Sequence, residues 1–190
     1  MAAVDSEGRA VSLIQSVFHA FGSGILEPAT GIICHNRGAC FSLDPGSPNR
    51  IAPGKRPAHT LMPVLLRDAG GRVSAHGTMG GRAQPQIHVQ LLLRRLAGAS
   101  PEVAVAAPRF VVGGLDAGSE ADVIFAEEGL PAETAAALSR ARLELRTGGA
   151  LDEIVGHTQL AVRTADGLAA ASDPRADGRG LVVRREGSPA

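Results

Sequence analysis

Alternating apolar and polar residues predict short strands at both ends of the chain. Ala2–Asp5 and Ala10–Ser16 are expected to form a hairpin around the turn Ser6–Arg9. A second hairpin is expected from Leu61–Asp68 and Arg72–Gly77, which flank a pair of glycines. The remaining predicted strands are Thr30–Asn36, Phe110–Val112, Asp122–Phe125, Leu143–Arg146, Gly156–Arg163 and Leu168–Ala171, the last two joined by an Asp-Gly turn.

Helical signals are confined to the middle of the chain. Gln84–Leu96, Pro101–Ala106 and the Ala-rich Pro131–Ala141 each carry a Pro where a helix begins. Ser42–Pro57 has four Pro and two Gly in sixteen residues and is expected to be a loop. Because strands come in hairpins and do not alternate with helices, the order predicts an α+β fold of antiparallel strands with helices packed on them.

Composition narrows the functional classes. The chain has 190 residues, 44% of them apolar, which suits one globular domain. Formal net charge is zero and only 3% of residues are aromatic, so nucleic-acid binding, which needs clustered cations or stacking platforms, is not expected. The sequence shows neither a long apolar run for a membrane helix nor a signal peptide, which predicts no membrane contact and favours the cytoplasm for this chain.

Metal chemistry finds little support in the sequence. Cys34 and Cys40 are the only cysteines, and His35 lies between them. Two thiols and one imidazole without a second ligand pair do not make a zinc signature. We therefore expect semi-buried thiols, no metal and no cofactor.

Two short segments can carry chemistry. In GTMGG, residues 77–81, a predicted strand meets two glycines just before a helix, so backbone N–H groups there can hold an anion or an oxyanion. From the residues alone, a plain tight turn is favoured. In PGKRPAHTLMP, residues 53–63, prolines fix the donors Lys55, Arg56, His59 and Thr60, which suits a substrate carboxylate and equally a surface connector.

The ordered set of motifs resembles the γ-glutamyltranspeptidase family. The matching residues are Phe21–Gly24, Thr30–Ile32, Asn36, Phe41-Ser42, Pro53–Pro57, Gly77, Gly80-Gly81, Ala107–Phe110 and Ala171–Arg175. The resemblance implies the N-terminal-nucleophile hydrolase sandwich, αββα, made from a precursor that cleaves itself into a large and a small subunit. It also implies acyl transfer from γ-glutamyl amides such as glutathione to water, amino acids or peptides, with the first Thr of the small subunit as nucleophile.

The resemblance assigns roles to particular residues. Gly80 and Gly81 match the glycine pair of the oxyanion hole, and Ser16 matches a hydroxyl that supports the nucleophile. His59 and Thr60 match a Ser pair that contacts the substrate α-carboxylate.

Three positions depart from the family pattern. Phe18 replaces an Asn, Arg37 replaces a Gln or similar polar residue, and Cys40 replaces the Asp that pairs with the substrate ammonium. Because a thiol cannot neutralise a cation, we expect altered substrate recognition, with Arg37 favouring an extra carboxylate or a glutaryl-like acyl group.

Laid on the family pattern, residues 1–175 correspond to a small subunit without its nucleophile segment, and residues 176–190 to a flexible tail that frays after Asp173. The nucleophile is expected about three residues before Met1, and the large subunit is the expected partner. A periplasmic or secreted location remains open for the full precursor. The alternatives are a glutaryl- or cephalosporin-type amidase on the same scaffold and a non-catalytic remnant that binds a partner.

Overall fold

The computed structural model describes residues 1–114 and 122–183. The chain divides into two compact units. The first contains Met1–Ile14 and the residues from Met62 onward, and the second is Gln15–Leu61. Each unit is described by itself.

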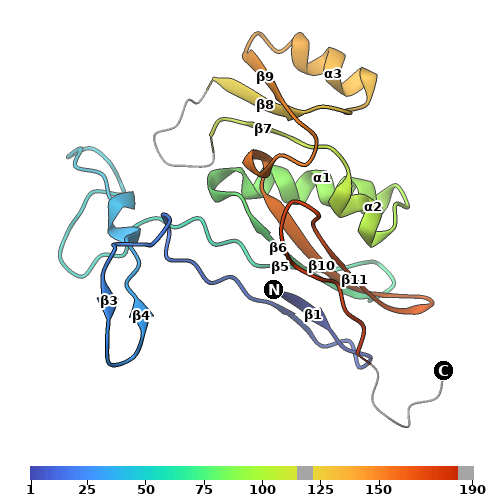
Figure 1. Cartoon of the computed structure of the whole chain (residues 1–190), viewed down its shortest axis with the longest axis horizontal. Coiled ribbons are helices and arrows are strands. Elements are labelled where there is room, and N and C mark those ends of the chain that lie inside the picture. Colours follow the sequence, from blue (N-terminus) through green and yellow to red (C-terminus); the bar gives the residue numbers. More distant parts are fainter. Residues whose placement is uncertain (115–121, 184–190) are drawn as a thin grey trace. The chain divides into compact units, whose positions relative to one another are not determined.

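A four-stranded antiparallel sheet is the centre of the first unit (Figure 1). Its order is β11-β10-β6-β5, formed by β11 (Gly167–Ser172), β10 (His157–Thr164), β6 (Val73–Met79) and β5 (Val64–Arg67). Six consecutive residues of β6 are buried, because this strand has neighbours on both edges and packed layers on both faces. The hairpin turn predicted between β10 and β11 is confirmed, with Thr164 paired to Gly167.

The two faces of this sheet are covered by different layers. On one face, α1 (Gln84–Leu96) and α2 (Pro101–Ala106) pack against it, with a core formed by Leu91, Ala104, Val105, Leu160, Val162 and Ala171. On the other face lies the hairpin of β1 (Ala2–Val4) and β2 (Ala10–Ser12), which contacts β6 and β10 (Figure 1). The hairpin approaches closely because β6 offers a glycine there: a Cβ at Gly77 would lie 3.8 Å from Ser12 Oγ.

A smaller sheet of three strands has the order β7-β8-β9. Its strands β7 (Phe110–Val112), β8 (Val123–Glu127) and β9 (Glu144–Gly148) enclose, with α3 (Ala132–Ser139), a second core. The β8–β9 pair is parallel, unlike the antiparallel arrangement expected from the sequence. The helix α3 between them supplies the long crossover that a parallel pair requires.

The second unit has little regular structure. It holds the short hairpin of β3 (Leu26–Glu27) and β4 (Ile32–Ile33), followed by the 3₁₀ helix η1 (Arg37–Cys40). The strand predicted over Thr30–Asn36 is therefore too long. The Glu27 carboxylate accepts hydrogen bonds from the backbone N–H of Ala29 and Thr30, which fixes a turn where the strand was expected to start.

The ends of several elements also differ from the sequence-based expectation. The strand predicted over Ala10–Ser16 ends at Ser12. The chain does not fray directly after Asp173, because the side chain of Arg175 is buried in ion pairs. Residues 184–190 of the expected tail lie outside the described residues.

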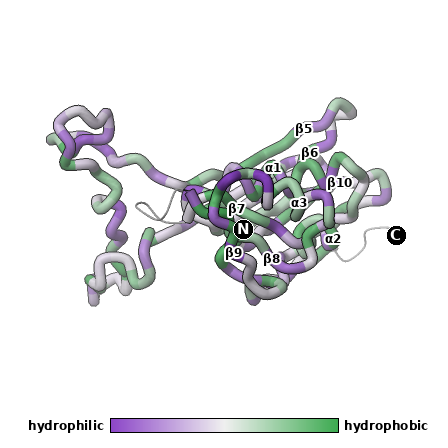
Figure 2. Tube along the Cα trace, turned by 90° about the horizontal axis from the view of Figure 1, so that it is seen from above, coloured by the Kyte–Doolittle hydropathy of each residue, from purple (hydrophilic) through white to green (hydrophobic). Residues whose placement is uncertain are grey.

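The half-buried, alternating strand β5 is largely hydrophobic in Figure 2. None of the described helices has the length and apolar character needed to cross a membrane.

Candidate active site

A glycine turn joins the end of β6 to the first helix. Gly80 and Gly81 follow Met79 directly, and the 3₁₀ helix η2 (Gly81–Ala83) leads into α1. Gly80 has φ 152° and Gly81 has φ 48°, values that favour glycine over residues with a side chain. A Cβ at Gly80 would also lie 2.5 Å from Cδ1 of the buried Ile87. The N–H groups of this turn open a helix and so lack intrahelical acceptors, which suits them to hold negative charge.

The glycine turn is supported from behind by the start of β10. The hydroxyl of Thr78 lies 2.6 Å from the carbonyl oxygen of Met79 and 3.0 Å from that of His157, and can donate to either. Gly156 backs the carbonyl of Met79 so closely that a Cβ there would lie 2.3 Å from that oxygen. Gly156 has φ 71°, again a glycine conformation. The turn therefore depends on close backbone packing from a strand far away in sequence.

A buried network of four charged side chains lies behind Gly156. Arg109 Nη2 donates to the carbonyl of Gly156 at 2.7 Å and to Asp173 Oδ2 at 2.6 Å. Arg175 bridges Asp173, at 2.8 Å, and Glu127, at 2.6 Å. Glu127 in turn accepts from the backbone N–H of Arg109 at 2.7 Å. We name these residues, Arg109, Glu127, Asp173 and Arg175, the charge network.

The charge network is electrically balanced. Burial opposes the ionised form of Asp173, but the positive charge of Arg109 and hydrogen bonds from Arg109 and Arg175 outweigh it and lower the pKa of the carboxyl. With two cations and two anions, the network buries no net charge. It was not predicted from the sequence as a structural element, although Arg109 and Asp173 lie in the two motifs APRF and ASDPR.

The second unit holds a buried arginine among hydroxyls. Arg37, on η1, is 9% exposed. Its Nη1 donates to Thr60 Oγ1 at 3.2 Å, its Nη2 lies 3.5 Å from Ser16 Oγ, and its Cζ lies 4.3 Å from the centre of the Phe18 ring. We name Ser16, Phe18, Arg37 and Thr60 the Arg37 cluster. The structure thus brings together four residues that the sequence analysis named, Ser16, Phe18, Arg37 and Thr60.

The hydroxyl oxygen of Ser16 accepts hydrogen bonds from two other members of the cluster. Its Oγ accepts a hydrogen bond from the backbone N–H of Phe18 at 2.9 Å and faces Arg37. Phe18 has φ 80°, which is strained for a residue with a side chain and places both its N–H and its ring. A hydroxyl has one donor, and within the described chain no hydrogen bond is donated by Ser16. Its proton is therefore available to a further group.

The other predicted site residues of this unit are more exposed. Cys40 is partly buried, three residues after Arg37 on the same 3₁₀ helix, and His59 is exposed beside Thr60. Within residues 1–114 and 122–183, no group of three or more His, Cys, Asp or Glu side chains is placed to hold a metal ion.

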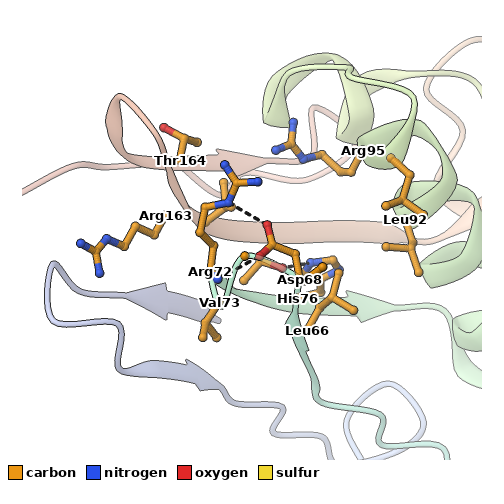
Figure 3. Close-up of a pocket in the computed structure, with 14 residues that line it drawn as sticks. Leu66, Asp68, Arg72, Val73, His76, Leu92, Arg95, Arg163 and Thr164 are labelled. Carbon is orange, nitrogen blue, oxygen red and sulfur yellow. Dashed lines mark hydrogen bonds and ion pairs between the residues drawn. The ribbon is translucent and has the colours of Figure 1, made fainter.

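A separate cavity lies at the opposite end of β6 from the glycine turn (Figure 3). It has a volume of about 480 Å³ and is lined by residues including Val73, Ser74, His76, Leu92 and Arg95. Since β6 rises about 3.3 Å per residue, its two ends are about 20 Å apart. This cavity is therefore not part of the glycine turn. In its lining, burial, and then the charges of His88 and Arg95, lower the pKa of His76 to about 4.

Comparison with known proteins settles the family. The family model for gamma-glutamyltranspeptidase matches residues 1–183. The chain belongs to the γ-glutamyltranspeptidase family. It is 40% identical over 180 residues to the oxamate amidohydrolase proenzyme of Klebsiella pneumoniae, covering 94% of this chain and 34% of that protein. It is 35% identical over 184 residues to the glutathione hydrolase-like YwrD proenzyme of Bacillus subtilis, covering 96% and 35%. The chain thus spans about a third of the curated relatives it matches.

Solved structures support the same conclusion for the fold of this family member. Cephalosporin acylase from Bacillus halodurans has a TM-score of 0.83 at 35% identity, over 97% of this chain and 34% of that one. A gamma-glutamyltranspeptidase from Pseudomonas nitroreducens has a TM-score of 0.79 at 28% identity, over 97% and 98%. The α+β fold is that of the N-terminal-nucleophile hydrolases, as the sequence predicted.

Proposed function

We propose that this chain supplies the small-subunit part of an amide-cleaving acyltransferase or hydrolase. The nucleophile is the Thr of the segment that precedes Val4-Asp5 in the family pattern, and a large subunit from the same precursor completes the enzyme. The observation that carries the proposal is the glycine turn, because strand, glycine pair and helix are arranged to present backbone N–H groups. The names of the relatives, several of them proenzymes, support it.

The proposed reaction is nucleophilic acyl transfer. The Thr hydroxyl attacks the amide carbonyl carbon while its own α-amino group takes the proton. The N–H groups of Gly80 and Gly81 hold the oxyanion, and the amine leaves with the proton. Water or an amine then attacks the acyl-enzyme, which releases the acid or the transferred product. By the family resemblance, Ser16 donates a hydrogen bond to the nucleophile oxygen, without transferring its proton, and so orients it.

The substrate is a γ-glutamyl amide or a related acyl amide. Glutathione hydrolases among the relatives support the first, and the oxamate amidohydrolase and cephalosporin acylase support the second. Cys40 favours the second, because in the family resemblance it replaces the Asp that pairs with a substrate ammonium. His59 and Thr60 remain candidates for binding a substrate carboxylate.

Expression of the full precursor tests the proposal. We expect self-cleavage before the nucleophilic Thr, seen by mass spectrometry, and ammonia or amine release from at least one amide. Ser16→Ala should lower kcat about fivefold to tenfold, the worth of one hydrogen bond. The exposed Ser6→Ala should not change it. A precursor that neither cleaves itself nor hydrolyses any amide would support the non-catalytic alternative.

A further inference from the structure

The cavity at the start of β6 is lined only by residues of the first unit. Its walls come from the β5–β6 turn, the start of β6, the last turns of α1 and the end of β10. Its volume of about 480 Å³ falls in the range of roughly 300–1,000 Å³ that is usual for small-molecule sites. The apolar part of the wall is formed by Leu66, Val73, Leu92, Leu96 and Val162. The cavity therefore has the size and the lining of a site for a ligand with an apolar body.

The cavity also holds a cation that lacks a counter-ion. Arg95, in the last turn of α1, forms no ion pair with a carboxylate in the described part of the chain. Of its five N–H groups, one donates to a protein acceptor there, the carbonyl of Ala99. The C-terminal end of α1 offsets only about half of an elementary charge. Arg95 therefore keeps both charge and donors for a ligand.

The other charged groups of the lining leave this positive charge in place. Arg72 Nε lies 2.7 Å from Asp68 Oδ2, so these two form a neutral pair. In Figure 3 the guanidinium of Arg95 points toward that of Arg72, and the guanidinium of the exposed Arg163 points away from both. A ligand in the cavity thus meets one net positive charge, carried by Arg95.

The buried residues of the lining form a polar but uncharged floor. Ser74 and His76 lie on one face of β6, both are buried, and Ser74 Oγ lies 2.8 Å from His76 Nε2. Burial, and then the charges of His88 and Arg95, keep the pKa of His76 at about 4, so its imidazole is neutral at pH 7. The floor therefore adds no second positive charge that a dianion would need.

We propose that this cavity binds a small monocarboxylate with an apolar body, of the class of medium-chain fatty acids. The carboxylate binds Arg95 beside Arg72, and the alkyl chain lies against the leucine and valine side chains of the wall. A planar carboxylate accepts two parallel hydrogen bonds from a guanidinium, and its single charge matches the single unpaired cation. Each methylene that leaves water adds to the affinity.

This binding site is separate from the glycine turn. The two ends of β6 are about 20 Å apart, so a carboxylate bound at Arg95 does not occupy the oxyanion hole. Binding depends on no nucleophile and on no residue of the second unit. The inference therefore goes beyond the proposed function.

Calorimetry on the complete protein gives the first test. Sodium octanoate, sodium hexanoate and 1-octanol are titrated in at pH 7, with sodium chloride at equal ionic strength as reference. We expect one octanoate per chain, bound about tenfold more tightly than hexanoate, because two further methylenes are buried. Octanol, which lacks the charge, should bind about tenfold more weakly than octanoate or worse. Absence of saturable octanoate binding, or equal affinity for octanol, overturns the inference.

Variants of the lining give the second test. Arg95→Gln should weaken octanoate binding about tenfold to a hundredfold, because charge-assisted hydrogen bonds are lost. Leu96 lines the cavity but is 72% exposed, so Leu96→Ser should leave the fold intact and reduce the gain from hexanoate to octanoate. Arg67→Gln is the matched control, because Arg67 is an exposed arginine of the neighbouring strand β5 that does not line the cavity. Unchanged octanoate affinity in folded Arg95→Gln and Leu96→Ser proteins overturns the inference.

Amide hydrolysis measured in parallel separates this inference from the proposed function. Octanoate binding that Arg95→Gln weakens supports the cavity site even if the protein hydrolyses no amide. Hydrolysis without octanoate binding contradicts the cavity site and leaves the proposed function standing.

Discussion

Replacing Asp173 by Asn tests whether the charge network holds the first unit together. The carboxylate accepts from Arg109 Nη2 at 2.6 Å, from the backbone N–H of Thr158 at 2.9 Å and from Arg175 Nη1 at 2.8 Å. Asn has nearly the same size but only one acceptor oxygen, and its NH₂ group faces donors. Arg109, which is fully buried, then loses the carboxylate with which it forms its ion pair among the described residues.

The expected loss is large for a single substitution. Removing one partner of a buried ion pair costs about 3–5 kcal/mol, because the other charge stays buried and unpaired. For a chain of this length, that lowers Tm by about 6–20 °C. We expect Asp173→Asn to lower the urea midpoint, followed by circular dichroism, by a corresponding amount with an unchanged m value.

Asp68→Asn is the matched control. Asp68 pairs with Arg72 at 2.7 Å, but both side chains are substantially exposed, so solvent screens the pair and little stability should be lost. The pKa of Asp173 is lowered in the folded state, so its contribution is present at neutral pH and is lost as pH falls below the ordinary carboxyl value of 3.8. The difference between wild type and Asp173→Asn should shrink there. Equal effects of the two Asn substitutions at pH 7 would refute the reasoning.

Two further substitutions probe the first unit. Gly156→Ala should destabilise the fold by about 1–3 kcal/mol in chemical denaturation, because the new Cβ meets the Met79 carbonyl and φ is 71°. The control Gly149→Ala should be nearly neutral, because nothing lies within 4 Å of a Cβ there. Equal effects of the two substitutions would contradict the packing argument. The free energy of unfolding should also fall by up to about 3 kcal/mol between pH 6.5 and pH 4. Over this range His76 binds a proton in the unfolded chain but stays mostly neutral in the folded chain, where burial lowers its pKa to about 4. His76→Gln should flatten that slope, leaving the smaller part due to His88, and an unchanged slope would show that His76 is not responsible.

Local signals predicted the helices well. The predicted bounds Gln84–Leu96 and Pro101–Ala106 are those of α1 and α2. A proline in the first turn marks both, and the Ser100 side chain accepts from the N–H of Val103 at the start of α2. Such signals lie within a few residues and can be read directly from the sequence.

Contacts between distant segments could not be predicted in this way. Ser16, Arg37 and Thr60 were singled out one by one, and only the fold of the second unit shows that they form one cluster. The parallel pairing of β8 with β9 depends on how α3 packs, which periodicity does not reveal. The pairing of Arg109 with Asp173 joins residues far apart in sequence, and the only local signal was an unusual charge beside a proline in each motif.

The order of the charge network along the chain has a consequence for synthesis on the ribosome. Arg109 and Glu127 emerge first, and their partners Asp173 and Arg175 follow the last strand, β11. Until residues 173–175 leave the exit tunnel, neither Arg109 nor Glu127 has the side chain with which it forms its ion pair. We therefore expect the first unit to fold only late in synthesis, because the network closes only when almost all of the described chain is available.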